Sequence, residues 1–189
     1  MKTPGRGMAR RTAVSGKETN PLRQLEVFFD YACPYCLRGH RFLKSLVPRY
    51  PDVAVVWRPC EAHPRPDPYG PHSHLCIQGF FFMKDCGADL WAYHDRMFRA
   101  ALIDRADIED VRVLARYAEG LADTHAFCGA LRAGTYRRAQ LEANAGAWDR
   151  QRLAAVPSYR MDGRRLDSVE DVGVTEQQLA RFLACGLIR

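Results

Sequence analysis

The chain has 189 residues, of which 47% are hydrophobic and 26% charged, and its formal net charge is +6. This length and composition are typical of one compact domain with a single hydrophobic core. No stretch approaches the roughly 20 consecutive apolar residues of a membrane-spanning helix, and the N-terminus lacks the roughly 7–15-residue apolar segment of a secretory signal. The sequence therefore predicts no membrane partner and a cytoplasmic location.

The positive charge is concentrated at the start of the chain. Residues 1–23 contain a single acidic residue, Glu18, against Lys2, Arg6, Arg10, Arg11, Lys17 and Arg23. The same segment is rich in Gly, Pro, Ser and Thr, a composition that predicts a disordered basic arm. A fold that binds nucleic acid spreads its positive charge over a folded face, so this distribution predicts no nucleic-acid partner.

The first ordered elements form a predicted strand, helix and strand. Leu25–Phe29 is an apolar run of strand length, and from Cys33 the apolar spacing changes to three and four residues, with Pro34 just inside the helix start. Val53–Trp57 is the second strand, and its lack of polar alternation predicts that it is covered on both faces. Together they predict a βαβ unit with a parallel strand pair.

A block of helices is expected to follow. The predicted helices of this insertion, about residues 61–152, are Leu75–Lys84, Leu90–Leu102, Val111–Leu121, Thr124–Leu131 and Tyr136–Trp148. Asp162-Gly163 between two short strand-like runs, Val156–Met161 and Arg164–Leu166, then predicts a β-hairpin. Thr175 with Gln178 predicts a capped final helix that ends before Gly186. The fold class is α/β, with a core domain at residues 24–60 and 153–189.

Cys33 and Cys36 are the residues most able to carry chemistry. They lie three positions apart at the expected start of a helix, a separation that a disulfide can span. Unpaired backbone N–H groups at the helix N-terminus favour a thiolate, so a lowered pKa is expected for Cys33, the attacking thiol. Cys36, one turn further on, is expected to be the buried resolving thiol. Pro34 and Tyr35 stiffen the turn between them.

The other cysteines require no chemical function. A C-x-x-C pair can also form half of a zinc site, but no second pair follows it. The segment with Cys60, His63, His72, His74 and Cys76 contains zinc-ligand types, yet it is expected to be a loop without metal. Cys86, Cys128 and Cys185 are expected to pack as inert apolar residues, although further disulfides among the five remaining cysteines stay open.

At this point the residues resemble a known family. The segment Val27–Cys36 resembles the DsbA-like branch of the thioredoxin superfamily, including its FrnE-like and 2-hydroxychromene-2-carboxylate isomerase-like members. Trp57-Arg58-Pro59, Glu61 and His63-Pro64 are similar to what those members carry after the second strand. The resemblance implies a thioredoxin-like fold with a helical insertion, and a cis-proline facing the cysteines. The matching residue is Pro157, preceded by Val156.

Three positions depart from the family pattern. Ala155 stands where a glycine usually precedes Val-Pro, and Tyr35 stands where DsbA has histidine. Val27 occupies the position of the buried acid found six residues before the first cysteine, so proton transfer at Cys36 must rely on water or on Asp30. Asp30 itself is interpreted first as a turn residue.

These features favour a thiol–disulfide oxidoreductase that acts on protein or small-molecule substrates. No cofactor is expected beyond the redox-active pair, with glutathione as a conceivable co-substrate and a homodimer as a conceivable assembly. Two alternatives remain: a glutathione-dependent isomerase or transferase on the same scaffold, and a redox-switched binding module. Cys36 argues against the isomerase, because that chemistry needs no resolving thiol.

Overall fold

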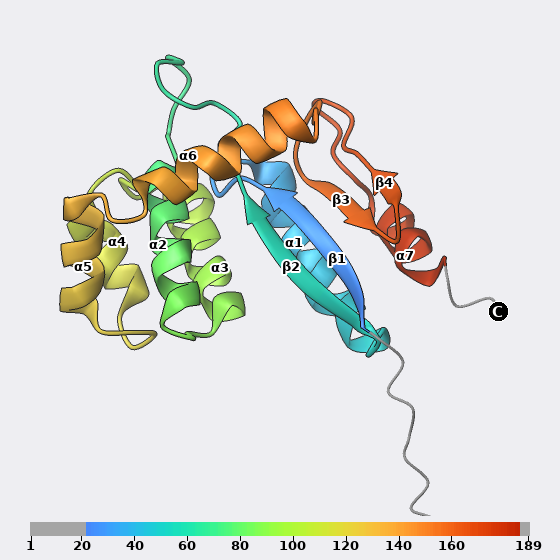
Figure 1. Ribbon diagram of the computed structural model, residues 1–189, viewed down its shortest axis with the longest axis horizontal. Coiled ribbons are helices and arrows are strands. Elements are labelled where there is room, and N and C mark those ends of the chain that lie inside the picture. The colour runs from blue at the N-terminus through green and yellow to red at the C-terminus, as the bar shows by residue number, and fades with distance from the viewer. Residues whose placement is uncertain (1–21, 186–189) are drawn as a thin grey trace, which may run out of the picture.

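The computed structural model describes residues 22–185, and its centre is a mixed four-stranded sheet in the order β2-β1-β3-β4 (Figure 1). β1 (Arg23–Phe29) pairs in parallel with β2 (Val53–Pro59), and the register places Arg23 opposite Val53. On its other edge β1 pairs antiparallel with β3 (Ser158–Met161), which in turn pairs with β4 (Arg164–Leu166). The βαβ unit and the C-terminal hairpin are therefore confirmed.

Two helices of the core domain pack against each other beside the sheet. α1 (Pro34–Leu46) forms the crossover between β1 and β2 and continues into a short 3₁₀ helix, η1 (Val47–Arg49). α7 (Glu176–Ala184) packs on α1. The predicted capping box is present at α7, because Thr175 accepts from the Gln178 N–H while the Gln178 side chain accepts from the Thr175 N–H.

The insertion forms a helical block at one end of the sheet (Figure 1). Its elements are α2 (His74–Asp85), α3 (Leu90–Phe98) with the π-helical segment η2 (Arg99–Ile103), α4 (Val111–Ala118), α5 (Thr124–Ala133), and α6 (Arg137–Ala145) with the π-helical segment η3 (Gly146–Arg150). α6 starts beside α5 and crosses the top of the molecule toward β3 (Figure 1). This course brings the end of the insertion back to the sheet.

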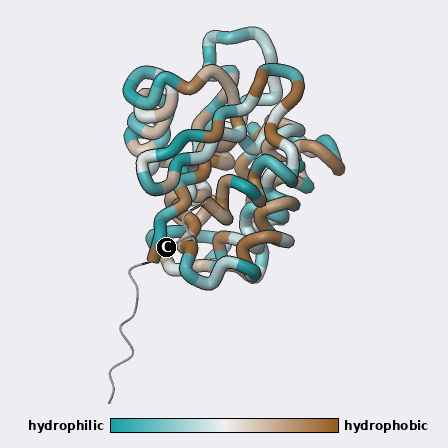
Figure 2. Tube along the Cα trace, turned by 90° about the vertical axis from the view of Figure 1, so that its right-hand side faces the viewer, coloured by the Kyte–Doolittle hydropathy of each residue, from teal (hydrophilic) through white to brown (hydrophobic). Residues whose placement is uncertain are grey.

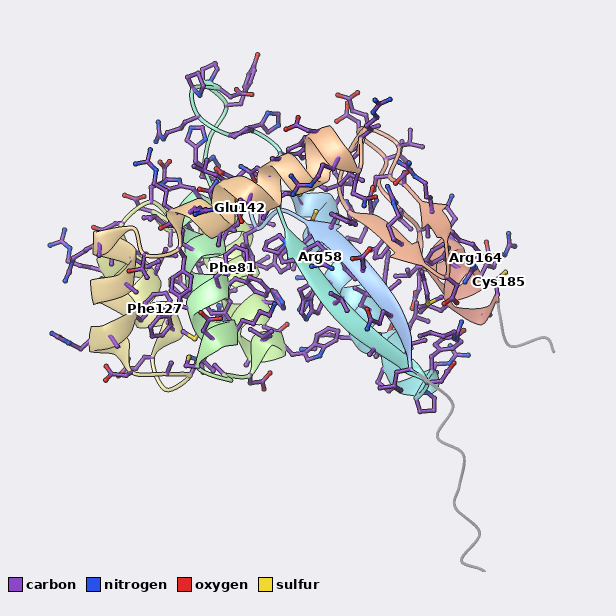
Figure 3. All side chains as sticks on the ribbon, in the orientation of Figure 1. Arg58, Phe81, Phe127, Glu142, Arg164 and Cys185 are labelled. Atoms are coloured by element: carbon purple, nitrogen blue, oxygen red, sulfur yellow. The ribbon has the colours of Figure 1, made fainter. Side chains whose placement is uncertain are left out.

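Aromatic residues fill the junction between sheet and block. The Phe29 ring makes edge contacts with Tyr31 and His94, whose centroids lie 5.1 and 5.0 Å away. Phe127 on α5 is fully buried within the block (Figure 3). Apolar and polar segments alternate along the trace, as expected for elements that bury one face (Figure 2). No helix among residues 22–185 has the length and apolar character needed to cross a bilayer.

Two expectations about the strands need correction. β2 is an edge strand that pairs only with β1 in this sheet, and Ala54, Val55, Val56 and Trp57 are half-buried. The expected full cover on both faces is wrong, because these successive residues point alternately to the two faces and all stay partly exposed. Arg23, assigned to the basic arm, belongs to β1, where its Nε donates to Asp52 at 2.7 Å. Leu22 of the predicted arm is exposed, and residues 1–21 of that arm lie outside the described residues, as does Gly186.

Candidate active site

Cys33 is the N-cap residue of α1, and Pro34 occupies the first turn. The backbone of Cys33 is extended (φ −92°, ψ 119°), and the Cys33 Sγ accepts a hydrogen bond from the backbone N–H of Cys36 at 3.4 Å. Proline suits this turn because the first helical N–H groups have no intrahelical partner. The sequence therefore positions one sulfur at the helix end, half-buried, with the second sulfur fully buried one turn inside.

The pKa values of the two thiols are shifted in opposite directions. A hydrogen bond from the Cys36 side chain lowers the pKa of Cys33, and backbone N–H groups of Cys36 and Tyr35 act in the same direction. Burial raises the pKa of Cys36 well above its ordinary value, and the neighbouring Cys33 raises it further. The expected difference between the two pKa values is present, and the Cys36 side chain is the largest single cause of the shift at Cys33.

The segment before β3 faces the exposed side of Cys33. The Val156–Pro157 peptide bond is cis, and the Cys33 Sγ lies 3.6 Å from the Val156 carbonyl oxygen. Ser168 fixes the position of this segment, because its Oγ donates a hydrogen bond to the Pro157 carbonyl oxygen at 2.5 Å. The structure thus brings together residues from β1–α1 and from the hairpin that are far apart in the sequence.

α1 approaches the hairpin closely because residue 39 is glycine. A Cβ on Gly39 would lie 2.5 Å from the Tyr159 hydroxyl oxygen and 3.2 Å from Cγ of Pro157. Tyr159 is fully buried, its hydroxyl has no hydrogen-bond partner among the described residues, and burial raises its pKa above the ordinary value. Sequence reasoning missed both residues, although a glycine inside an amphipathic helix is a signal of close packing.

Tyr35 connects α1 to the loop between β4 and α7. Its hydroxyl donates to the Asp171 carbonyl at 2.6 Å, and Arg38 donates to the carbonyl of Val172. Val169 and Val172 of this loop are 64% and 55% exposed. Beyond stiffening the turn, Tyr35 therefore fixes this loop, with its two exposed valines, against the first turn of α1.

Asp30 closes the turn that leads into the helix. Its Oδ1 accepts the Ala32 N–H at 2.8 Å and its Oδ2 accepts the Ala62 N–H at 2.7 Å, so it is a turn residue, as predicted. It is also buried, with 3% of its surface exposed. Burial raises the pKa of its carboxyl group.

Glu61 fixes the segment that follows β2. Its carboxylate accepts hydrogen bonds from Gln140 at 2.6 Å and from Asn144 at 3.2 Å, and its backbone carbonyl accepts the Trp148 indole N–H at 2.7 Å. These contacts tie the segment to α6 and η3. Burial raises the pKa of Glu61.

The remaining cysteines are free thiols that differ in exposure. Cys60 and Cys76 are fully buried, whereas Cys86 and Cys185 are exposed and Cys128 is half-buried. The expectation that Cys86 and Cys185 pack as apolar residues is therefore wrong; Cys185 lies at the end of α7, where Arg164 donates to its carbonyl oxygen at 2.7 Å (Figure 3). Within residues 22–185, no three His, Cys, Asp or Glu side chains are arranged to hold a metal ion.

A thioredoxin-like fold with a C-x-x-C pair at the N-terminus of its first helix defines a disulfide oxidoreductase. Comparison with known proteins identifies the family. The family model described as the DSBA-like thioredoxin domain matches residues 24–180, and the chain belongs to this family.

Individual relatives agree with this assignment. The chain is 25% identical over 171 residues to the protein YwbO of Bacillus subtilis, an alignment that covers 71% of this chain and 84% of YwbO. A structure described as a probable DsbA oxidoreductase from Streptomyces coelicolor superposes with a TM-score of 0.67 at 17% identity, covering 86% of this chain and 88% of that one. The cytosolic disulfide reductase DsbM from Pseudomonas aeruginosa gives 0.66 at 17% identity, covering 87% and 98%. These two likenesses establish the shared fold.

Proposed function

We propose that the chain exchanges thiols and disulfides with protein or small-molecule substrates, with Cys33 as the attacking thiolate and Cys36 as the resolving thiol. The observation that carries this assignment is the asymmetry of the pair. Cys33 is half-buried at the helix end with a lowered pKa, whereas Cys36 is fully buried with a raised pKa. A thiol that is accessible and readily ionised attacks first.

The reaction balances over two exchange steps. The Cys33 thiolate attacks a substrate disulfide, forms a mixed disulfide, and releases one substrate sulfur as a thiolate that takes up a proton. Cys36 then loses its proton and attacks the Cys33 sulfur, which forms the Cys33–Cys36 disulfide and releases the second substrate thiol. Two electrons pass from the protein dithiol to the substrate, and the reverse sequence oxidises a substrate dithiol.

Val156 and Pro157 support a role in receiving the substrate. The Val156 carbonyl oxygen lies beside the Cys33 sulfur, where it can accept an N–H from an extended substrate chain. The exposed Val169 and Val172 of the neighbouring loop provide apolar surface near Tyr35. We therefore assign this face to substrate binding.

Cysteine variants test the assignment. Cys36→Ser should accumulate mixed disulfides with a disulfide-containing substrate, and Cys33→Ser should form none and lose turnover. Full turnover by Cys33→Ser would overturn the proposal. A Cys36→Ser variant that keeps full glutathione-dependent activity would instead favour the single-thiol isomerase, which needs no resolving residue.

We also propose the cytoplasm as the site of action, with glutathione as a co-substrate. Free thiols beyond the pair, including the exposed Cys86 and Cys185, fit a reducing compartment. Reduction of the Cys33–Cys36 disulfide by glutathione, measured at cytoplasmic concentrations, tests the co-substrate. A disulfide that stays oxidised under these conditions would contradict it.

A further inference from the structure

A cavity of about 500 Å³ lies where α2, α5 and α6 meet the segment after β2 (Figure 1). A cavity of this volume can hold a ligand the size of a short peptide. Leu75, Leu131 and Leu141 give it apolar surface, and its other lining side chains are mostly polar or charged. Neither Cys33 nor Val156 lines it, so the cavity is separate from the cysteine site.

The buried side chains of the cavity offer hydrogen-bond acceptors. Glu61 and Gln78 both line it and are 3% and 4% exposed. Within residues 22–185, the Glu61 carboxylate is held by the neutral amides of Gln140 and Asn144 rather than by an Arg or Lys side chain. The Gln78 Oε1 atom is buried and has no hydrogen-bond partner among the same residues. A buried carboxylate needs a cation and a buried carbonyl oxygen needs a donor, so one ammonium group would satisfy both.

The exposed side chains of the cavity are cationic. Arg132 near the end of α5 and Arg137 at the start of α6 line it and are exposed to solvent. Arg137, Gln140 and Asn144 are spaced three and four residues apart, so they share one face of α6. This face runs from a cation at the mouth to the amides that hold Glu61. Guanidinium groups bind carboxylates well, so the mouth suits an anionic group.

We propose that this cavity binds a short zwitterionic peptide, whose N-terminal ammonium group pairs with Glu61 and Gln78 and whose C-terminal carboxylate is bound by Arg132 and Arg137. Burial raises the pKa of Glu61 in the free protein, and a ligand ammonium group offsets that cost of ionisation. The site is additional to the thiol–disulfide exchange assigned to the cysteine pair and does not depend on it.

Isothermal titration calorimetry at pH 7 with three thiol-free probes tests both ends of the ligand. Trialanine carries both charges, N-acetyl-trialanine lacks the ammonium group, and trialanine amide lacks the carboxylate. Trialanine should bind, and the N-acetyl derivative should bind about tenfold more weakly, the effect of losing a hydrogen bond to a buried charged group. The amide should bind about threefold more weakly, because exposed ion pairs contribute less. Equal affinity for the three probes, or no binding of trialanine, would overturn the proposal.

A matched pair of arginine variants tests the mouth of the cavity. Arg137→Gln should weaken trialanine binding about threefold and leave trialanine amide unaffected, because the amide has no carboxylate to lose. Arg138→Gln removes the same charge from the next position of α6, where the side chain pairs with Glu142 at 2.8 Å and does not line the cavity. It should change neither affinity. Equal weakening by both variants would reveal a general effect of charge and would contradict a carboxylate site.

Two variants test the buried end. Gln78→Leu should cost little stability in urea unfolding, because the lost oxygen has no partner among the described residues, but it should weaken trialanine binding. In Glu61→Gln, the affinities for trialanine and N-acetyl-trialanine should become nearly equal, a ratio that a change in stability alone would not alter. An unchanged ratio would contradict the pairing of the ammonium group with Glu61.

The location of the bound peptide is measured in the wild-type protein. In NMR titrations with trialanine, the side-chain amide resonances of Gln78, Gln140 and Asn144 should shift, whereas that of Gln24 on β1, outside the cavity, should not. Shifts confined to residues around Cys33 and Pro157 would place the peptide on the substrate face and would overturn the proposal.

Discussion

The Cys33 Sγ lies 3.6 Å from the carbonyl oxygen of Val156, so an ionised Cys33 faces an oxygen that carries partial negative charge. The thiolate must therefore be stabilised from the opposite side. The structure provides this through Cys36, whose backbone N–H donates to the Cys33 sulfur and whose side chain lowers the pKa of Cys33. The reactivity of Cys33 therefore depends on Cys36.

Replacement of Cys36 should accordingly weaken the nucleophile. In Cys36→Ala the side-chain donor is lost and the pKa of Cys33 rises, so alkylation of Cys33 at pH 6 should slow by about tenfold, the effect of one hydrogen bond to a charged group. Cys36→Ser keeps an O–H donor and is the matched control. Stopped-flow alkylation across pH measures both variants. Equal slowing of the two would show that the side-chain hydrogen bond is unimportant.

The exposure of the other thiols predicts their order of modification. In the native reduced protein, Cys33 should react first with a thiol reagent and the exposed Cys86 and Cys185 after it. Cys60 and Cys76 should react only after unfolding, since both are fully buried and burial raises their pKa. Peptide mapping by mass spectrometry measures the order. Rapid native labelling of Cys60 would contradict the packing around the loop after β2.

Glu61 predicts a stability effect that depends on pH. Because burial raises its pKa above that of the unfolded chain, the folded protein binds the proton more tightly. Stability from this group is fully present below the unfolded pKa and is lost as pH rises through the folded pKa. Wild-type protein should therefore lose stability from this group between pH 4 and pH 7, whereas Glu61→Gln should not. In urea unfolding, the free energy of unfolding of Glu61→Gln minus that of wild type should increase as the pH rises.

Asp52 supplies the control with the opposite sign. A hydrogen bond from Arg23 lowers its pKa, so its stabilising contribution is present above the unfolded pKa and is lost as pH falls through the folded pKa. Asp52→Asn should thus lose stability relative to wild type as pH rises over the acidic range. If the difference in free energy of unfolding between Glu61→Gln and wild type did not change with pH, burial would not raise the pKa of Glu61.

The parts of the site that were predicted from the sequence are those set by local pattern. The change in apolar spacing at Cys33, with Pro34 beside it, marks the helix start because both signals arise within one turn. The edge position of β2 was not predictable in this way, since an apolar run carries no information about which strands flank it. Likewise the contact of the Asp30 carboxylate with the N–H of Ala62 joins residues far apart in the sequence, and the importance of Gly39 depends on its contact with Tyr159.

Gly39 leads to the sharpest packing prediction. An added methyl group would lie 2.5 Å from the Tyr159 hydroxyl oxygen, a distance that requires α1 or the hairpin to move. Gly39→Ala should lower the free energy of unfolding by about 1–3 kcal/mol, the usual cost of overpacking a core. Gly129→Ala is the control, because a Cβ at that exposed position of α5 meets nothing within 4 Å. It should stabilise the protein by up to about 1 kcal/mol through helix propensity.

The source of the strain can be isolated with Tyr159→Phe. This change removes the contacting oxygen, and since that buried hydroxyl has no partner among the described residues, the single variant should be close to neutral. Combined with Gly39→Ala, it should restore part of the lost stability and return Pro157 toward the Cys33 sulfur. Urea unfolding of all four proteins, together with the Cys33 alkylation rate, completes the double-mutant cycle. Strict additivity would show that α1 does not press on the Tyr159 hydroxyl.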